Sequence, residues 1–185
     1  EIEVSGESDH AGTTPMEMRK DALFTTNDII QIIRQKLATI HDKLVFTIGR
    51  MNIFPNIHTV IPNKVVFTLE ARHKNPAVMK ELSSLTNNEG CHIRTNKLWD
   101  RSTVWFDEDL LDVLNQSVKS LGYSHKRMVS GAGHDAQFIA SYIPTAMVFV
   151  PSINGKSHCE TELTLWEDCT KGVNVLLEVV MYLQT

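Results

Sequence analysis

The chain has 185 residues, of which 42% are hydrophobic and 22% charged, and its formal net charge is −4 at pH 7. This composition is that of an ordinary globular protein, and the length suffices for one sizeable core or two smaller ones. The mildly acidic charge without a basic block argues against nucleic acid as a partner, and no apolar run approaches the roughly 20 residues that span a membrane.

The first 105 residues predict the element order β-α-β-β-α-β. Residues 1–5 alternate like a strand, and Pro15 suits the first turn of a helix whose apolar residues recur at helical spacing as far as Leu37. The predicted strands are 1–5, 44–54, 64–72 and 91–105, and the predicted helices are 15–37 and 75–86. This order is typical of the ferredoxin-like fold, in which two helices cover one face of a four-stranded antiparallel sheet.

After Phe106 the predicted elements alternate between helix and strand. The predicted helices are 108–121, 136–142 and 165–183, and the predicted strands are 126–129 and 145–150. The order α-β-α-β-α is typical of an α/β layer, but two strands do not complete a sheet. We therefore expect a mixed α+β and α/β chain: a ferredoxin-like domain over 1–105, then the C-terminal part of an α/β domain over 106–185 whose other strands lie upstream.

Three cysteines, Cys91, Cys159 and Cys169, are odd in number and irregularly spaced. Without a CxxC motif, they favour a reducing, cytoplasmic setting over a disulfide framework. The chain opens directly in a strand-like EIEVSGE, with neither an initiator methionine nor the pattern of a signal peptide. We therefore expect a piece of a longer cytoplasmic protein.

A polar loop, PSINGKSHCETE, follows the predicted strand 145–150 and contains His158. Loops at strand ends often hold functional side chains, and a neutral imidazole is a good ligand for a divalent metal. A solvated histidine is the more common occurrence at such a position. The neighbouring Cys159 could be a thiolate ligand or a nucleophile, although a bystander thiol is the more ordinary interpretation.

Three other stretches carry groups with two interpretations each. In SGAGHD, Gly131 lets the backbone approach a ligand beside a helix N-terminus, or belongs to a plain glycine turn. His10, in HAGTTP, could donate a hydrogen bond to a developing oxyanion, or be an ordinary polar loop residue. Arg72 ends a predicted strand and could bind a carboxylate through two hydrogen bonds, or pair with Glu70.

Four segments together closely resemble the M20-type metal-dependent amidohydrolases. The resemblance is to the branch that contains N-carbamoyl-L-amino-acid hydrolases, allantoate amidohydrolases and ureidoglycolate hydrolases. The segments, which occur in the family order and cover nearly the whole chain, are 6–23 (GESDHAGTTPMEMRKDAL), 55–73 (PNIHTVIPNKVVFTLEARH), 130–136 (SGAGHDA) and 151–162. HAGTTPM, RxDAL and GAGHDA favour this branch over an ordinary M20 peptidase.

The resemblance implies a catalytic α/β domain with two divalent metal ions and an inserted ferredoxin-like lid that forms a homodimer. On the family pattern, His158 is a metal ligand, and His10 reaches into the partner subunit's active site to polarise the scissile carbonyl. Arg72 binds the substrate carboxylate, and the Gly131 backbone contacts the substrate. The implied reaction is hydrolysis of the ureido C–N bond of an N-carbamoyl-L-amino acid or an allantoate-like ureido acid by metal-activated water. The ligand types admit zinc, manganese, nickel or cobalt.

The chain departs from the family pattern in two respects. Thr59, in TVIP, stands where the family usually has an asparagine that helps to hold the substrate carboxylate. The other metal ligands and the general-base glutamate have no counterpart here, and His158 alone cannot hold two ions. We therefore expect a C-terminal fragment that is inactive by itself. The alternative is a non-catalytic dimerisation or ligand-binding module, which would hold no metal.

Overall fold

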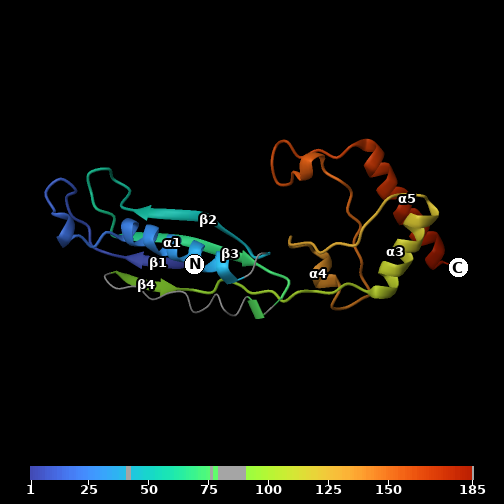
Figure 1. Ribbon diagram of the computed structural model, residues 1–185, viewed down its shortest axis with the longest axis horizontal. Helices are drawn as coiled ribbons and strands as arrows, with labels where there is room; N and C mark the ends of the chain where they lie inside the picture. The colour runs from blue at the N-terminus through green and yellow to red at the C-terminus, as the bar shows by residue number, and fades with distance from the viewer. Residues whose placement is uncertain (41–42, 76, 79–90, 185) are drawn as a thin grey trace. The chain divides into compact units, whose positions relative to one another are not determined.

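The computed structural model describes residues 1–40, 43–75, 77–78 and 91–184. The chain divides into two compact units, Glu1–Thr103 and Val104–Thr185. In Figure 1 the first unit runs from blue to yellow-green and the second from yellow to red. Most of the helix predicted at 75–86 lies outside the described residues.

The first unit contains a four-stranded antiparallel sheet with the strand order β2-β3-β1-β4. The strands are β1 (Ile2–Ser5), β2 (Val45–Phe54), β3 (Lys64–Arg72) and β4 (His92–Thr95). The prediction of a four-stranded antiparallel sheet is therefore confirmed. The last strand is much shorter than the predicted 91–105. β4 pairs with the short β1, with Ile2 opposite Thr95, and two backbone hydrogen bonds between Glu1 and Asn96, each 2.9 Å long, extend the contact by one residue.

One helix, α1 (Ala22–Ile40), packs along one face of this sheet (Figure 1). Its buried side chains recur every three or four residues, as the periodicity of an amphipathic helix requires. They are Ala22, Thr26, Ile29, Ile33 and Leu37. They meet the inward residues of β1 and β3, among them Val4, Val65 and Phe67, which are fully buried. A single hydrophobic core therefore holds helix and sheet together.

This helix begins at Ala22 and not, as predicted, at Pro15. The carboxylate of Asp21 accepts hydrogen bonds from the backbone N–H groups of Leu23 (2.9 Å) and Phe24 (3.1 Å) and so caps the helix. Pro15 instead precedes a single 3-10 turn, η1 (Met16–Met18). Residues 6–20, which include this turn, form an irregular loop between β1 and α1.

The second unit is built mainly from two helices that pack together, α3 (Glu108–Ser120) and α5 (Trp166–Leu183). Asp107 caps α3 by accepting from the Leu110 N–H at 2.9 Å. Short elements lie between them: α4 (Ala136–Ile139) and η3 (Ile153–Gly155). No helix within the described ranges is long and apolar enough to cross a membrane.

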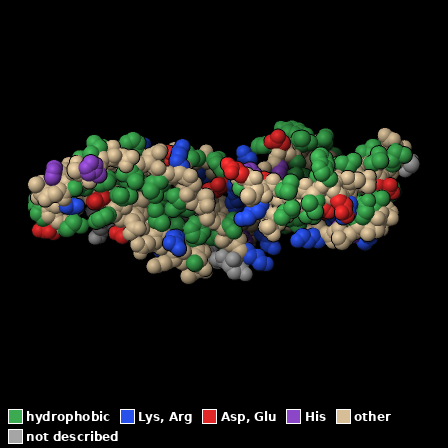
Figure 2. Space-filling view, turned by 90° about the horizontal axis from the view of Figure 1, so that it is seen from above, with side chains coloured by type: hydrophobic (Ala, Val, Ile, Leu, Met, Phe, Trp, Pro, Cys, Tyr) green, Lys and Arg blue, Asp and Glu red, His purple; other side chains and the backbone are tan. Residues whose placement is uncertain are grey.

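The strands predicted at 126–129 and 145–150 are not formed in the second unit. A strand requires hydrogen bonds to a neighbouring strand, and the described part of this unit supplies none. The Thr145 carbonyl, for example, accepts from the Asp107 N–H at the start of α3 (3.0 Å). Many large hydrophobic side chains of this unit are exposed, and Figure 2 shows hydrophobic patches on its surface. The described residues of this unit therefore leave much apolar surface unburied.

Candidate active site

The structure brings two of the predicted site residues, His10 and Thr59, together. The Ala11 N–H donates to the Thr59 carbonyl at 2.9 Å, and the Ile61 N–H donates to the Asp9 carbonyl at 2.9 Å. These bonds join the loop after β1 to the connection between β2 and β3. The sequence assigned both residues to substrate binding only through the family pattern, whereas their adjacency follows from the sheet topology.

The orientation of the His10 ring defines which of its nitrogens can donate. Its Nδ1 accepts a hydrogen bond from the Gly12 N–H at 3.1 Å. A neutral imidazole carries one proton, so the proton lies on Nε2 while this bond is present. The side chain is exposed, and its Nε2–H is therefore a donor that the loop can present to a ligand.

The loop that carries His10 is held by Arg19, a residue that we did not predict as part of the site. Its Nε donates to the Thr14 carbonyl at 3.0 Å and its Nη2 to the Ala11 carbonyl at 2.6 Å. Beside it, the exposed Lys20 pairs with Glu7 at 2.6 Å, and this hydrogen bond raises the pKa of Lys20. The only sequence signal for Arg19 was its place in the RxDAL motif.

Arg72 lies at the opposite end of the same sheet. It is the last residue of β3, whereas Thr59 lies in the connection that enters β3 at Lys64. Eight residue steps of about 3.3 Å separate the two ends of the strand by about 26 Å. The guanidinium pairs with Glu70, with Nε at 2.8 Å and Nη2 at 2.5 Å from the same carboxylate oxygen. The first unit thus keeps Arg72 apart from His10.

In the second unit, the glycine-rich segment SGAGHD is shaped by a contact between Ser130 and His134. The Ser130 Oγ lies 2.9 Å from His134 Nε2 and accepts from the Ala132 N–H at 3.2 Å. The His134 ring packs edge-on against Phe149, with the ring centroids 5.4 Å apart. Gly131 is exposed at the turn, and a Cβ placed there would meet no other atom within 4 Å. A larger residue at this position would therefore meet no steric obstacle from the described chain.

His158 lies exposed in its loop with a left-handed backbone, at φ +57°. Its N–H donates to the Glu162 carboxylate at 2.7 Å, so Glu162 braces the loop. Within the described ranges, no three His, Cys, Asp or Glu side chains gather to hold a metal ion. His158 fits the role of one imidazole ligand, but a binuclear site needs ligands from outside these residues.

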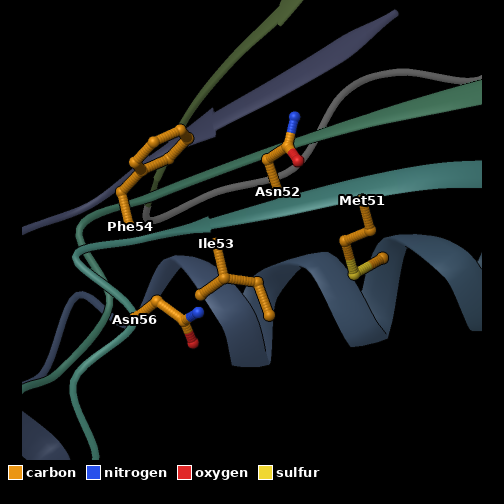
Figure 3. A pocket seen from close by; sticks show the side chains of 5 residues that line it. All are labelled: Met51, Asn52, Ile53, Phe54 and Asn56. Atoms are coloured by element: carbon orange, nitrogen blue, oxygen red, sulfur yellow. The ribbon is translucent and has the colours of Figure 1, made fainter.

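Figure 3 shows a small pocket at the end of β2, beside the connection that carries Thr59. Met51 and Ile53 point toward the side on which α1 lies, while Asn52 and Phe54 point the other way. The pocket has a volume of about 240 Å³, which is below the roughly 300–1,000 Å³ of typical small-molecule sites. None of the predicted site residues lines it, so we do not assign substrate binding to this pocket.

Comparison with known proteins identifies the family. Residues 7–182 match the family described as peptidase family M20/M25/M40. The chain belongs to this family, whose amidohydrolases are generally dependent on divalent metal ions. The resemblance inferred from the motifs is thereby confirmed.

Individual relatives narrow the resemblance to one branch. Allantoate amidohydrolase of Escherichia coli K12 is 36% identical over 95% of this chain and 44% of its own length. N-carbamoyl-L-amino-acid amidohydrolase of Paenarthrobacter aurescens is 32% identical over 97% of this chain and 45% of its own length. A crystal structure of a hydantoinase/carbamoylase family amidase from Burkholderia vietnamiensis has a TM-score of 0.90 at 33% identity, covering 98% of this chain and 46% of that one. The chain spans less than half the length of these relatives.

Proposed function

We propose that this chain is the C-terminal part of an amidohydrolase that cleaves the ureido C–N bond of an N-carbamoyl-L-amino acid or an allantoate-like ureido acid. The observation that carries the proposal is the His10 loop, in which the Gly12 N–H leaves the imidazole with an Nε2–H donor. A ureido carbonyl is a poor electrophile because two nitrogens donate into it. A donor aimed at its oxygen would stabilise the oxyanion that forms when water adds.

The other candidate residues take complementary roles in this proposal. Arg72 binds the substrate carboxylate together with the hydroxyl of Thr59 of the partner subunit, which would enter the site beside His10 of the partner subunit. The exposed Gly131 backbone fixes the orientation of the substrate. His158 is one ligand of a pair of divalent ions, zinc or manganese or alternatively nickel or cobalt, which would supply activated water. Because the remaining ligands lie outside this chain, we propose that the chain is inactive alone.

We further propose that residues 1–105 form a ferredoxin-like lid through which two copies dimerise, and that His10 acts in the partner's site. The strand order β2-β3-β1-β4 supports the fold assignment. Among the described strands the ten-residue β2 lies at the edge of the sheet, and one side of its backbone pairs with none of them. The separation of about 26 Å along β3 supports the assignment of His10 and Arg72 to different sites.

Residues 106–185 are proposed to be the C-terminal portion of the catalytic α/β domain. Segments 126–129 and 145–150, which were predicted as strands from their sequence and pair with no strand in the described chain, support this assignment. So does the length of the relatives, more than half of which lies beyond this chain. The three free cysteines support a cytoplasmic location.

The proposal is tested by assaying the full-length gene product and this 185-residue chain side by side. Two metal ions per site and hydrolysis of an N-carbamoyl-L-amino acid or allantoate are expected from the full-length product alone. A full-length product that holds no metal and hydrolyses neither compound would favour the non-catalytic binding module. The observation that favours this binding module is Thr59, which stands where the family usually has an asparagine.

The dimeric site is tested by mixing two full-length variants, His10→Ala and Arg72→Ala, each expected to be inactive. Random exchange makes half of the dimers mixed, and each mixed dimer has one intact site, so about a quarter of the wild-type activity should return. The matched control is His10→Ala mixed with itself, which should remain inactive. A mixture that stays inactive would show that His10 and Arg72 serve the same subunit.

A further inference from the structure

Arg19 bridges the two ends of the turn that follows His10. Its guanidinium donates to the carbonyls of Ala11 (2.6 Å) and Thr14 (3.0 Å), and the side chain is partly buried. Gly12, whose N–H meets the His10 ring, lies between these two carbonyls in the sequence. The arginine therefore holds the stretch of backbone from which that N–H projects.

The space around Gly12 makes this arrangement sensitive to small movements. A Cβ at Gly12 would lie 3.1 Å from His10 Cε1 and 3.4 Å from Nδ1, so the ring packs directly against the glycine backbone. The Thr14 Oγ donates to the His10 carbonyl at 2.9 Å and closes the turn from the other side. A shift of this backbone would move both the ring and the N–H that selects its tautomer.

We propose that Arg19 is a positioning residue for the proposed reaction: it holds the Ala11–Thr14 turn so that the Gly12 N–H keeps His10 in its Nε2–H form. A guanidinium suits this task because its planar fork donates to two carbonyls in fixed directions, whereas a lysine ammonium is a single flexible donor. The inference rests on the proposed role of His10, but its structural part can be tested without catalysis.

The first experiment measures the His10 tautomer by long-range ¹H–¹⁵N correlation in the 185-residue chain at alkaline pH, where the imidazole is neutral. The ring signals are assigned by their loss in His10→Gln. The wild-type chain should show the Nε2–H form, and Arg19→Ala should show a mixture of both tautomers. Lys20→Ala is the matched control, because it removes a neighbouring cation whose ion pair is exposed and should leave the tautomer unchanged.

The second experiment measures kcat and KM of the full-length product. Arg19→Ala should lower kcat roughly 10- to 100-fold with little change in KM, because a misplaced donor acts on the transition state rather than on binding. Arg19→Lys should recover part of the loss, and Lys20→Ala should retain the wild-type kcat. Recovery by lysine separates positioning from a general loss of folded protein.

The outcomes distinguish this inference from the proposed function. An unchanged tautomer in a folded Arg19→Ala chain would overturn the inference. If Arg19→Ala does not fold, the His10 tautomer is measured in Arg19→Lys instead. A wild-type tautomer in Arg19→Lys together with a wild-type kcat would overturn the inference. A full-length His10→Ala product with wild-type kcat would instead refute the role of His10, while the tautomer measurement still tests whether Arg19 holds the turn.

Discussion

The two units of this chain differ in how completely they bury their apolar side chains. In the first unit, Val65 and Phe67 are fully buried and Leu37 is 1% exposed, and four strands pair behind one helix. In the second, Tyr142 is 88% and Trp166 86% exposed, and segments 126–129 and 145–150 pair with no strand in the described chain. The first unit therefore buries a hydrophobic core of its own, whereas the described residues of the second leave much of their apolar surface exposed.

The largest effect is expected when the two units are expressed separately. We expect residues 1–103 to unfold cooperatively and residues 104–185 to show exposed hydrophobic surface without a cooperative transition, because large apolar area stays in water. Thermal unfolding followed by circular dichroism, with dye binding to hydrophobic surface, measures both. A sharp transition in 104–185 alone would show that α3 and α5 suffice for a stable fold.

Two phenylalanines, one buried in the first unit and one exposed in the second, test the difference in packing between the units. Phe67→Ala should lower the free energy of unfolding of the first unit by about 3–5 kcal/mol, because it removes a fully buried side chain and leaves a cavity. Phe138→Ala, whose side chain is 57% exposed, should change stability by no more than about 0.5 kcal/mol. Urea unfolding followed by residue-resolved NMR separates the units. Equal effects would contradict the difference in packing.

Two glycines separate a structural role from a functional one. A Cβ at Gly6 would lie 1.9 Å from the Lys20 carbonyl oxygen, so Gly6→Ala should destabilise the first unit by about 1–3 kcal/mol. Gly131→Ala meets no such obstacle and should leave thermal stability unchanged. Under the proposed function, however, Gly131→Ala should raise KM of the full-length product. Loss of stability without a change in KM would assign Gly131 a structural role instead.

The smallest expected effect concerns pH. The Lys64 side chain, hydrogen-bonded to Glu3, lowers the pKa of that carboxyl below its ordinary value of 4.5. The folded first unit thus gains stability that is fully present above 4.5 and lost as the pH falls through the lowered pKa. Glu3→Gln should therefore lose slightly less thermal stability than the wild type as the pH falls into the acidic range. Identical acid limbs for Glu3→Gln and wild type would contradict the role of this pair.

The periodicity of single segments predicted much of the fold. The alternation in β1 and β3 and the helical spacing up to Leu37 are local patterns, and they anticipated the sheet and the helix that covers it. The boundaries were less predictable. Asp21 caps α1 where Pro15 was expected to begin it, and β4 stops where its short partner β1 ends.

The family could be predicted from the sequence, and candidate site residues proposed, because motifs such as HAGTTP and GAGHDA are contiguous in the chain. The folded chain was needed to show that His10 lies beside Thr59 and that Arg72 lies at the far end of β3. It also showed that segments 126–129 and 145–150 pair with no strand among the described residues. Arg19 likewise became visible only through its hydrogen bonds to two carbonyls of a folded turn. Each of these features depends on hydrogen bonds or strand pairing between segments distant in the sequence, which form only in the folded chain and which no local pattern encodes.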